Sequence, residues 1–148
     1  MGIVNEHKLP TPTPDVTPET EPYWEGASEQ ILRLRVCEDC DLTYYYPRAH
    51  CPGCLSDRTR WVEASGRGTV YAHTVTRQTH GPFADATPYV LAYVELEEGP
   101  RMMTNIVNCD PESIEVGQPV RAVYHETESE DQEVALVRFE PVESLSPR

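Results

Sequence analysis

Apolar and polar side chains alternate along most of the second half of the chain, with the period of two that is typical of β-strands. Five segments carry this pattern and are rich in the β-branched and aromatic residues that strands favour. These segments are Thr69–Arg77, Tyr89–Leu96, Arg101–Val107, Pro119–His125 and Glu133–Phe139. A helical turn is expected after the third segment, in residues 110–115, and a solvated acidic hairpin loop in residues 126–133. Five strands arranged in this way predict a small closed Greek-key barrel, the OB-fold.

Two shorter strand patterns flank a group of cysteines earlier in the chain. Ile31–Val36 alternates apolar and basic residues and leads into the first cysteine pair, whereas Arg60–Glu63 follows the second pair. The turn sequence Ser65–Gly68 then separates these strands from the barrel. Strands that enter and leave two cysteine pairs predict a rubredoxin-like zinc ribbon.

The first 18 residues have the composition of an extended segment, because four prolines stand among threonines with almost no large apolar residues. Such a segment forms no core of its own, and two alternatives remain: a disordered tail, or an arm that lies across another surface. The same composition is typical of interdomain linkers, which raises the alternative that the chain corresponds to part of a longer protein.

A short helix is expected to follow this segment. Thr20 is a good N-cap residue, and the helix should end near Gly26–Ser28. Tyr23 and Trp24 on this helix are expected to pack onto the rest of the fold. The protein is therefore predicted to be mainly β, with three parts: a Pro-rich arm and short helix (1–29), a zinc ribbon (30–66) and a five-stranded OB-fold barrel (67–148).

The charge of the chain limits the classes of partner. There are 12 basic and 25 acidic residues, a formal net charge of −13, so the field of the protein repels nucleic acids. The stretch Arg33–Arg67 differs, because its arginines and acids almost balance. Two interpretations of this stretch stay open: it binds an anionic ligand or an acidic partner, or it is an ordinary salt-bridged surface.

The apolar runs and the N-terminus predict a cytoplasmic protein. No run approaches the roughly 18 apolar residues that a membrane helix needs. Met1–Val4 is followed at once by Asn5, Glu6 and His7, so neither a signal peptide nor a myristoylation motif is expected. We therefore expect no membrane partner.

Four of the five cysteines form two C-x2-C pairs, Cys37 with Cys40 and Cys51 with Cys54. Two residues between the cysteines let both thiolates of a pair face one ion, and two such pairs complete a tetrahedral site of four sulfurs. Two disulfides are the structural alternative, but they belong to oxidising compartments. A thioredoxin-like redox pair would need only one C-x2-C and a βαβ pattern, which is missing. Metal binding is therefore the preferred interpretation.

Zinc is preferred over a rubredoxin-like iron, because a closed site in a ribbon typically serves folding, with an apparent binding free energy on the order of 10 kcal/mol. Four thiolate ligands leave no coordination position for a reactive water, so the zinc is expected to be structural. His50 stands beside Cys51, but its side chain is expected to point away from the pair and not to bind the ion.

No residue pattern predicts catalysis by this chain alone. Phosphate-binding loops, zinc-protease helices, nucleophile elbows and paired carboxylates are all missing from the sequence. Cys109 is left over from the metal site and is expected to be a buried, unreactive thiol, because a nucleophile needs a nearby base and a lowered pKa. We expect no catalytic residue and no organic cofactor.

The order of motifs closely resembles the acyl-CoA-associated zinc-ribbon/OB-fold family, over about residues 18–142. The resemblance rests on a Pro-Glu-Thr-x-Pro-Tyr-Trp helix, Tyr-Pro-Arg between the cysteine pairs, Trp61, Ser-Gly-Arg-Gly-Thr-Val-Tyr at 65–71, and Pro-Tyr-Val-Leu-Ala-Tyr-Val at 88–94. It implies a fold of zinc ribbon plus OB barrel, with the family's metal ligands at Cys37, Cys40, Cys51 and Cys54.

The resemblance also implies a function. Members of this family look like accessory subunits of thiolase-superfamily enzymes, in some cases of lipid-transfer-protein-like aldolases that shorten steroid side chains, where the module can be the C-terminal part of a hydratase subunit. Residues 99–105 are similar to this steroid-linked branch. We therefore expect a non-catalytic subunit that binds and activates such an aldolase in a hetero-oligomer, with acyl-CoA at the interface.

Three other functions remain as alternatives. The first is an accessory subunit of an acetyl-CoA acetyltransferase, from the same resemblance. The second is a single-stranded nucleic-acid-binding module, because OB-folds and zinc ribbons occur there, although the acidic charge argues against it. The third is an iron-bearing electron carrier, since four thiolates also suit iron.

Overall fold

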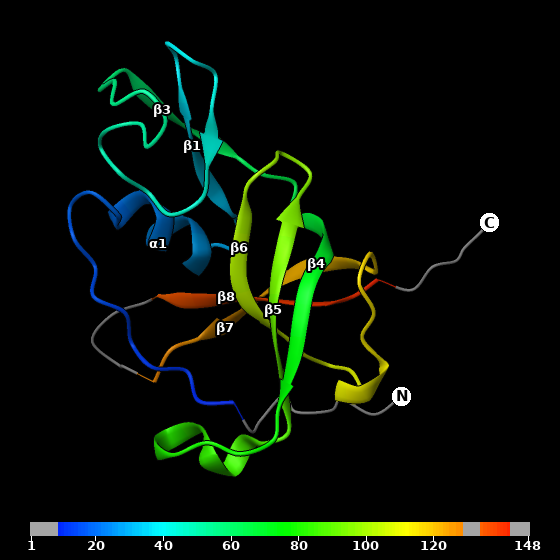
Figure 1. Ribbon diagram of the computed structural model, residues 1–148. Coiled ribbons are helices and arrows are strands. Elements are labelled where there is room, and N and C mark those ends of the chain that lie inside the picture. The colour runs from blue at the N-terminus through cyan, green and yellow to red at the C-terminus, as the bar shows by residue number, and fades with distance from the viewer. Residues whose placement is uncertain (1–8, 129–133, 143–148) are drawn as a thin grey trace.

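The computed structural model describes residues 9–128 and 134–142 (Figure 1). The described chain is mainly β, as predicted: a short helix, a small three-stranded sheet and a closed five-stranded barrel. The helix is α1 (Glu21–Ser28), and the small sheet contains β1 (Arg33–Cys37), β2 (Thr43–Tyr44) and β3 (Thr59–Glu63). The barrel contains β4 (Arg67–Thr76), β5 (Tyr89–Leu96), β6 (Arg101–Ile106), β7 (Pro119–Glu126) and β8 (Ala135–Pro141). Two 3-10 turns, Gly81–Ala86 and Pro111–Ser113, lie in its connections.

The small sheet has the order β2-β1-β3 with antiparallel pairing throughout. β1 enters the first cysteine pair and β3 leaves the second, as the sequence predicts. The ribbon therefore consists of these strands and the two cysteine loops, at the top of Figure 1 and above the barrel. No helix in the described part of the chain is long and apolar enough to cross a membrane.

The barrel has the strand order β4-β5-β6-β8-β7 and closes where β4 pairs with β7. Gly68 pairs with Leu96 on one side and with Val120 on the other, so both neighbours of β4 meet at this residue. A Cβ at Gly68 would lie 2.5 Å from the carbonyl oxygen of Glu95 and 2.7 Å from Cγ1 of Val94. Glycine is required here because the strands approach too closely for any side chain.

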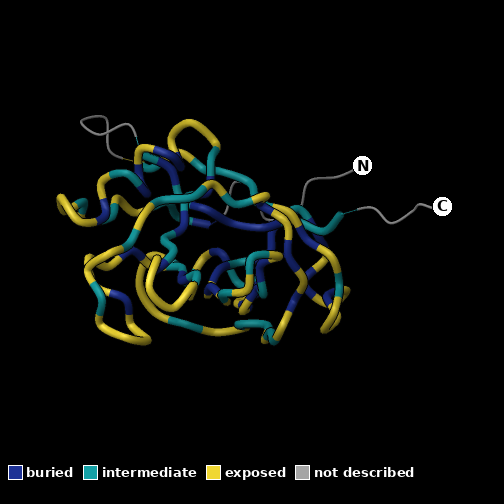
Figure 2. The backbone as a smooth tube through the Cα atoms, turned by 90° about the horizontal axis from the view of Figure 1, so that it is seen from above, coloured by how far each residue is buried: buried dark blue, intermediate teal, exposed yellow. Residues whose placement is uncertain are grey.

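Inward and outward residues alternate along β5 and β6, as the sequence predicts, whereas β8 buries the three consecutive residues Val137–Phe139. On β5, Val90, Ala92, Val94 and Leu96 are buried, while Tyr93 is exposed. Similar residues of the other strands complete the interior, as the dark segments of Figure 2 show. Burial of this apolar surface is the main stabilising contribution to the barrel.

Helix α1 joins the ribbon to the barrel. Tyr23, Trp24 and Ala27 are buried on the helix and belong to a hydrophobic cluster that includes Leu34 of the ribbon and Phe139 of the barrel. The Tyr23 ring packs edge-on against the Trp24 ring, with centroids 4.9 Å apart. The prediction that both aromatic residues pack onto the fold is confirmed, and one core extends through both parts of the protein.

The ends of the helix differ in part from the prediction. Thr20 occupies the N-cap position, but its hydroxyl makes no capping bond; it accepts from the amide of Thr17 at 3.1 Å and donates to the carbonyl of Thr17 at 3.3 Å. The backbone of Thr20 is already helical, which directs the hydroxyl to the preceding turn. The other end lies at Ser28 as expected, and Gln30 then takes a left-handed conformation, φ 65°.

The extended segment before the helix lies along the protein's own barrel. Leu9 is buried and clusters with Ala86 and Val107. The carbonyl of Pro10 accepts a hydrogen bond from the buried Arg138 guanidinium. The carbonyl of Thr11 accepts from the amide of residue 128 at 2.9 Å. The disordered tail is therefore wrong for residues 9–18, and the segment is an arm that lies on the surface of the protein's own barrel. Residues 1–8, and residues 129–133 of the predicted acidic loop, lie outside the described part.

Candidate metal centre

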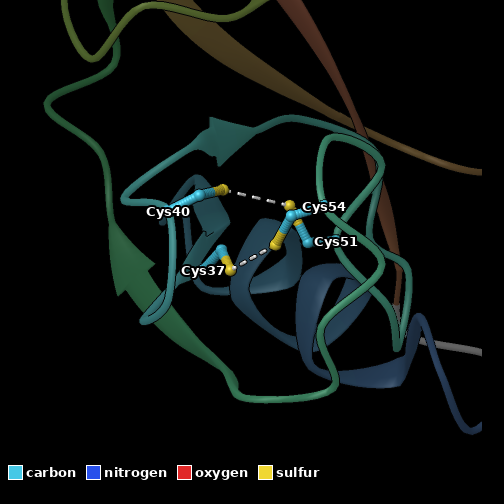
Figure 3. A group of neighbouring side chains, drawn as sticks. All are labelled: Cys37, Cys40, Cys51 and Cys54. Carbon is cyan, nitrogen blue, oxygen red and sulfur yellow. Dashed lines mark hydrogen bonds between the residues drawn. The ribbon is translucent and has the colours of Figure 1, made fainter.

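The four predicted ligands lie together at the end of the ribbon sheet. Their sulfur atoms are all within 4.8 Å of one another (Figure 3). The Sγ atoms of Cys37 and Cys54 are 3.6 Å apart, and so are those of Cys40 and Cys51. A tetrahedral zinc with Zn–S bonds near 2.3 Å would separate its sulfurs by about 3.8 Å. The residues present therefore fit a tetrahedral metal of this size.

The separations exclude the disulfide alternative for this structure. All five cysteines are free thiols, and the pairs that approach most closely come from different C-x2-C motifs. A disulfide would require sulfurs about 2.05 Å apart. Each motif instead directs both of its sulfurs toward the same point, which is the arrangement that a single ion needs.

Backbone hydrogen bonds shape the first cysteine loop. The amide of Asp41 donates to the carbonyl of Cys37 at 2.9 Å, and the amide of Cys37 donates to the carbonyl of Leu42 at 2.9 Å. The amide of Asp39 points at the Cys37 sulfur, 3.4 Å away. This last bond orients the Cys37 sulfur within the loop.

The second loop repeats this arrangement at the same sequence offsets. The amide of Leu55 donates to the carbonyl of Cys51 at 2.9 Å, and the amide of Cys51 donates to the carbonyl of Ser56 at 2.8 Å. The amide of Gly53 points at the Cys51 sulfur, 3.3 Å away. The C-x2-C spacing thus produces two copies of one knuckle, each of which preorganises two sulfurs.

The protein alone stabilises negative charge unequally on the sulfurs of Cys51 and Cys40. Burial raises the pKa of Cys51, but the amides of Cys54 and Gly53, together with neighbouring thiols, lower it to about 7. At Cys40 the Leu42 amide lowers the pKa, yet the neighbouring thiols and burial raise it to about 12. Four sulfurs in contact cannot all ionise without a compensating cation. A divalent metal supplies that charge and deprotonates its ligands.

Most arginines of the near-neutral stretch are used inside the ribbon. Arg58 contacts Asp39 at 2.7 Å and Glu38 at 3.9 Å, and Arg60 contacts Glu38 at 3.7 Å. The guanidinium of Arg35 stacks on the Trp61 ring, 4.7 Å from its centroid. For these residues the salt-bridged or packed surface is the correct alternative. Arg33 donates to the carbonyl of Pro22 at 3.1 Å. Within residues 9–128 and 134–142, Arg48 and Arg67 have neither an ion pair nor a ring contact, so the anion-binding alternative concerns these two arginines.

The other candidate side chains lie away from the metal centre. Cys109 is buried, as expected, and its thiol points at the carbonyl of Ile106, 3.8 Å away. Burial, with a smaller effect of Asp110, raises the pKa of Cys109 to about 11, so the thiol stays protonated near neutral pH. His50 is exposed and is not among the clustered ligands.

Two features of the knuckles were not predicted from the sequence. Asp41 and Leu55 occupy equivalent positions, four residues after the first cysteine of each knuckle, and both have left-handed backbones, with φ of 63° and 68°. The C-x2-C spacing could have indicated the turn, and Asp is a common residue at positive φ. Leu is not, so the sequence carried no local signal for the conformation of Leu55.

Comparison with known proteins identifies both parts of the chain. Residues 24–60 match the family model described as the ChsH2 rubredoxin-like zinc ribbon domain, and residues 61–125 match the ChsH2 C-terminal OB-fold domain. The two matches meet between residues 60 and 61, at β3, and cover most of the described chain. Both agree with the observed ribbon and barrel.

Individual proteins are similar over the same region. A DUF35 domain-containing scaffold protein of Methanothermobacter thermautotrophicus is 36% identical over 128 residues, covering 83% of this chain and 96% of that protein. The 3-oxo-4,17-pregnadiene-20-carboxyl-CoA hydratase alpha subunit of Mycobacterium tuberculosis is 33% identical over 114 residues, covering 75% of this chain. The chain spans 40% or less of the length of the hydratase alpha subunits that it matches.

A solved structure supports the similarity in three dimensions. A chain of the Ltp2-ChsH2(DUF35) aldolase superposes with a TM-score of 0.74 at 35% identity, covering 87% of this chain and 98% of that chain. Because the match includes almost all of that chain, the ribbon and the barrel are arranged similarly in both proteins.

Proposed function

This chain belongs to the ChsH2/DUF35 family of zinc-ribbon and OB-fold proteins, and we propose that it is a non-catalytic subunit that binds and activates a thiolase-like acyl-CoA enzyme. The preferred partner is an aldolase that performs retro-aldol cleavage in steroid side-chain degradation. Similarity to a chain of an aldolase and to a pregnadiene-carboxyl-CoA hydratase subunit supports this choice. The alternative partner is an acetyl-CoA acetyltransferase.

The metal site is the observation that carries the proposal. We propose that Cys37, Cys40, Cys51 and Cys54 bind one structural zinc ion, because their sulfurs surround one point at tetrahedral spacing. Four protein thiolates complete the coordination of zinc, so no position remains where the metal could activate water or substrate. Such a site stabilises a surface and supports docking better than it supports chemistry.

The described side chains support the assignment of chemistry to the partner. Cys109 is the one cysteine outside the metal centre, and its raised pKa and buried position make it a poor nucleophile. The shared core from Tyr23 to Phe139 holds the ribbon and the barrel as one unit. We infer that this unit orders the partner's active-site loops and closes the acyl-CoA channel against water.

The identity of the metal is tested on protein purified without added metal. Zinc predicts a colourless protein with one equivalent of zinc per chain by elemental analysis. A red protein that loses its colour on reduction would instead establish the iron-bearing electron carrier. Purified protein without any transition metal would contradict the metal site itself.

The subunit function is tested by expressing the chain together with the Ltp2-like thiolase-superfamily protein of the same organism. The proposal predicts co-elution on gel filtration and retro-aldol cleavage of a steroid-derived β-hydroxyacyl-CoA that the partner alone performs poorly. Thiolysis of acetoacetyl-CoA by a complex with an acetyltransferase would select the alternative partner. Equal activity of the isolated partner, with no co-elution, would reject the subunit function.

A nucleic-acid-binding function is the second candidate, because the barrel exposes aromatic side chains. Tyr71 and Tyr93 are 47% and 45% exposed, and the Arg101 guanidinium lies over the Tyr71 ring, 3.7 Å from its centroid. Single-stranded nucleic acids stack on such residues, but they also need a basic groove. Arg101 is paired with Glu95 at 3.2 Å, and the net charge of −13 opposes a polyanion. Salt-dependent binding of a single-stranded oligonucleotide would favour this candidate.

A further inference from the structure

The two knuckles have the same backbone but different residues at their left-handed position. Asp41 fills this position in the first knuckle, and Asp is among the residues that tolerate positive φ. Leu55 fills it in the second knuckle, with φ 68°. A leucine here is strained, because its Cβ is too close to the following carbonyl oxygen. Local backbone preference therefore does not explain leucine at this position.

Burial does not explain Leu55 either. Leu55 is 75% exposed, the highest exposed fraction of any large apolar residue within residues 9–128 and 134–142. Leu42 of the first knuckle is 39% exposed and reaches across to the second knuckle, where a Cβ on Gly53 would lie 3.1 Å from Leu42 Cδ2. Pro52 is exposed beside them. We call Leu42, Pro52 and Leu55 the knuckle tip.

The knuckle tip is held rigidly, which suits a binding anchor. The amide of Leu55 is fixed to the carbonyl of Cys51 at 2.9 Å, and Leu55 directly follows Cys54, whose sulfur belongs to the four-cysteine cluster. An apolar side chain on a preorganised loop loses little entropy when it enters a pocket, so it contributes strongly to affinity. A strained and solvent-exposed residue is a candidate for such a role.

Charge decides which kind of occupant fits the knuckle tip. Asp41 and Asp57 are exposed near the tip and have no cationic partner among residues 9–128 and 134–142. A second copy of the chain would bring the same acidic rim against them, and each copy carries a net charge of −13. The complementary surface is an apolar socket with a basic rim on a different protein.

We propose that the knuckle tip is the anchor by which this chain docks onto its thiolase-like subunit, with Leu55 inserted into an apolar socket surrounded by basic residues. This inference rests on the proposed function. It assigns the docking contact to the outer end of the ribbon, at the metal centre. The metal therefore stabilises the contact surface itself.

The test replaces Leu55 by asparagine, a residue that accepts a left-handed backbone. Leu55→Asn should keep one equivalent of zinc and raise the midpoint of thermal unfolding by about 2 °C, because the strain is relieved. The same variant should bind the Ltp2-like subunit about tenfold more weakly, measured by titration calorimetry. A residue that serves only the fold would not change stability and affinity in opposite directions.

A matched control is available on the barrel. Val116 is 68% exposed, and Val116→Asn removes a similar apolar side chain away from the ribbon. Its affinity for the Ltp2-like subunit should stay within twofold of the original protein. An equal loss of affinity in Val116→Asn would show a general effect of surface polarity and would reject the anchor.

The remaining outcomes separate the anchor from the proposed function. If Leu55→Asn keeps zinc and binds the Ltp2-like subunit as tightly as the original protein, the anchor is wrong and the subunit function stands. If Leu55→Asn loses zinc, the residue serves the metal centre and the anchor is again wrong. If sedimentation shows a homodimer that Leu55→Asn dissociates, a second copy is the occupant. If the original protein does not bind, both proposals fail.

Discussion

The ribbon and the barrel differ in how they obtain a fixed structure. Strands β5 and β6 of the barrel bury alternate residues, as Val90 and Val94 of β5 illustrate, and the five barrel strands close on themselves. In the ribbon, β3 buries no residue fully and β2 has only two residues. Apolar burial therefore specifies the barrel, whereas the ribbon depends on four cysteines and the helix packed beneath it. A small β-domain with little core needs a metal or a partner.

Removal of a metal ligand should have the largest effect and should separate the two regions. Cys40→Ser leaves three thiolates for an ion whose binding contributes on the order of 10 kcal/mol to folding of the ribbon. We expect loss of the metal and of hydrogen-exchange protection in β1 and β3, together with low solubility. Amides of β5 should keep their protection. Equal loss of protection in β1 and β5 would show that the barrel also depends on the metal.

Truncation of the aromatic residue between the two regions should have the next largest effect. Tyr23 is 2% exposed and belongs to the core that ribbon and barrel share, so Tyr23→Ala should cost about 3–5 kcal/mol of unfolding free energy. Urea unfolding should then show two transitions, because the link between ribbon and barrel is weakened. Tyr93→Ala is the control, since Tyr93 is 45% exposed on β5 of the barrel. A single transition in Tyr23→Ala would locate the coupling elsewhere.

A methyl group added where the barrel closes should have a smaller effect on stability, and this effect should be confined to the barrel. Gly68→Ala places a Cβ against the carbonyl of Glu95 and should cost about 2–3 kcal/mol of unfolding free energy through overpacking. The zinc content should stay at one equivalent per chain. Gly99→Ala is a useful comparison: the added Cβ meets nothing within 4 Å, but φ is +118° there, so its cost reports backbone strain alone.

The smallest effect is expected at the ion pair between β7 and β8. Burial raises the pKa of Glu140, but hydrogen bonds from Asn108 and Arg121, each 2.7 Å long, lower it below the ordinary value. A lowered folded pKa stabilises the protein above the unfolded pKa of about 4.3, and this stabilisation disappears as pH falls through the folded pKa. Glu140→Gln should therefore be less stable at pH 6 by about 1 kcal/mol or less.

The pH dependence provides the control for this pair. The difference in unfolding free energy between the original protein and Glu140→Gln should shrink from pH 6 toward pH 3. Release of zinc in acid affects both proteins and cancels in the difference. A difference that stays constant with pH would show that Glu140 acts through packing and not through its charge.

The sequence predicted most of the fold and the clustering of four cysteines, because strands show a local periodicity and the cysteine pairs show a local spacing. Alternation located all five barrel strands to within a few residues, and the C-x2-C spacing located the sulfurs that the structure brings together. The two residues of β2 escaped prediction, since a pair of residues has no measurable period. The 3-10 turn Gly81–Ala86 also escaped, because six residues are too few to show a helical period in the sequence.

Features that depend on distant contacts could not be predicted. Leu9 is a large apolar residue in a Pro-rich segment. It is buried because it packs against Ala86 and Val107, which are distant in the sequence. The hydrogen bond from Arg138 to the Pro10 carbonyl joins residues separated by 128 positions. At Thr20 a local sequence signal was misleading. The residue favours an N-cap, but its hydroxyl hydrogen-bonds to the backbone of Thr17 and caps no helix amide.

The continuous packing from Tyr23 to Phe139 has a mechanical consequence. A hinge between two parts needs a boundary with few side-chain contacts. The boundary between ribbon and barrel is instead filled by packed aromatic side chains. The outer end of the ribbon and the far end of the barrel therefore keep a constant distance and orientation relative to each other. Whatever touches both ends is held at a distance that this one chain determines.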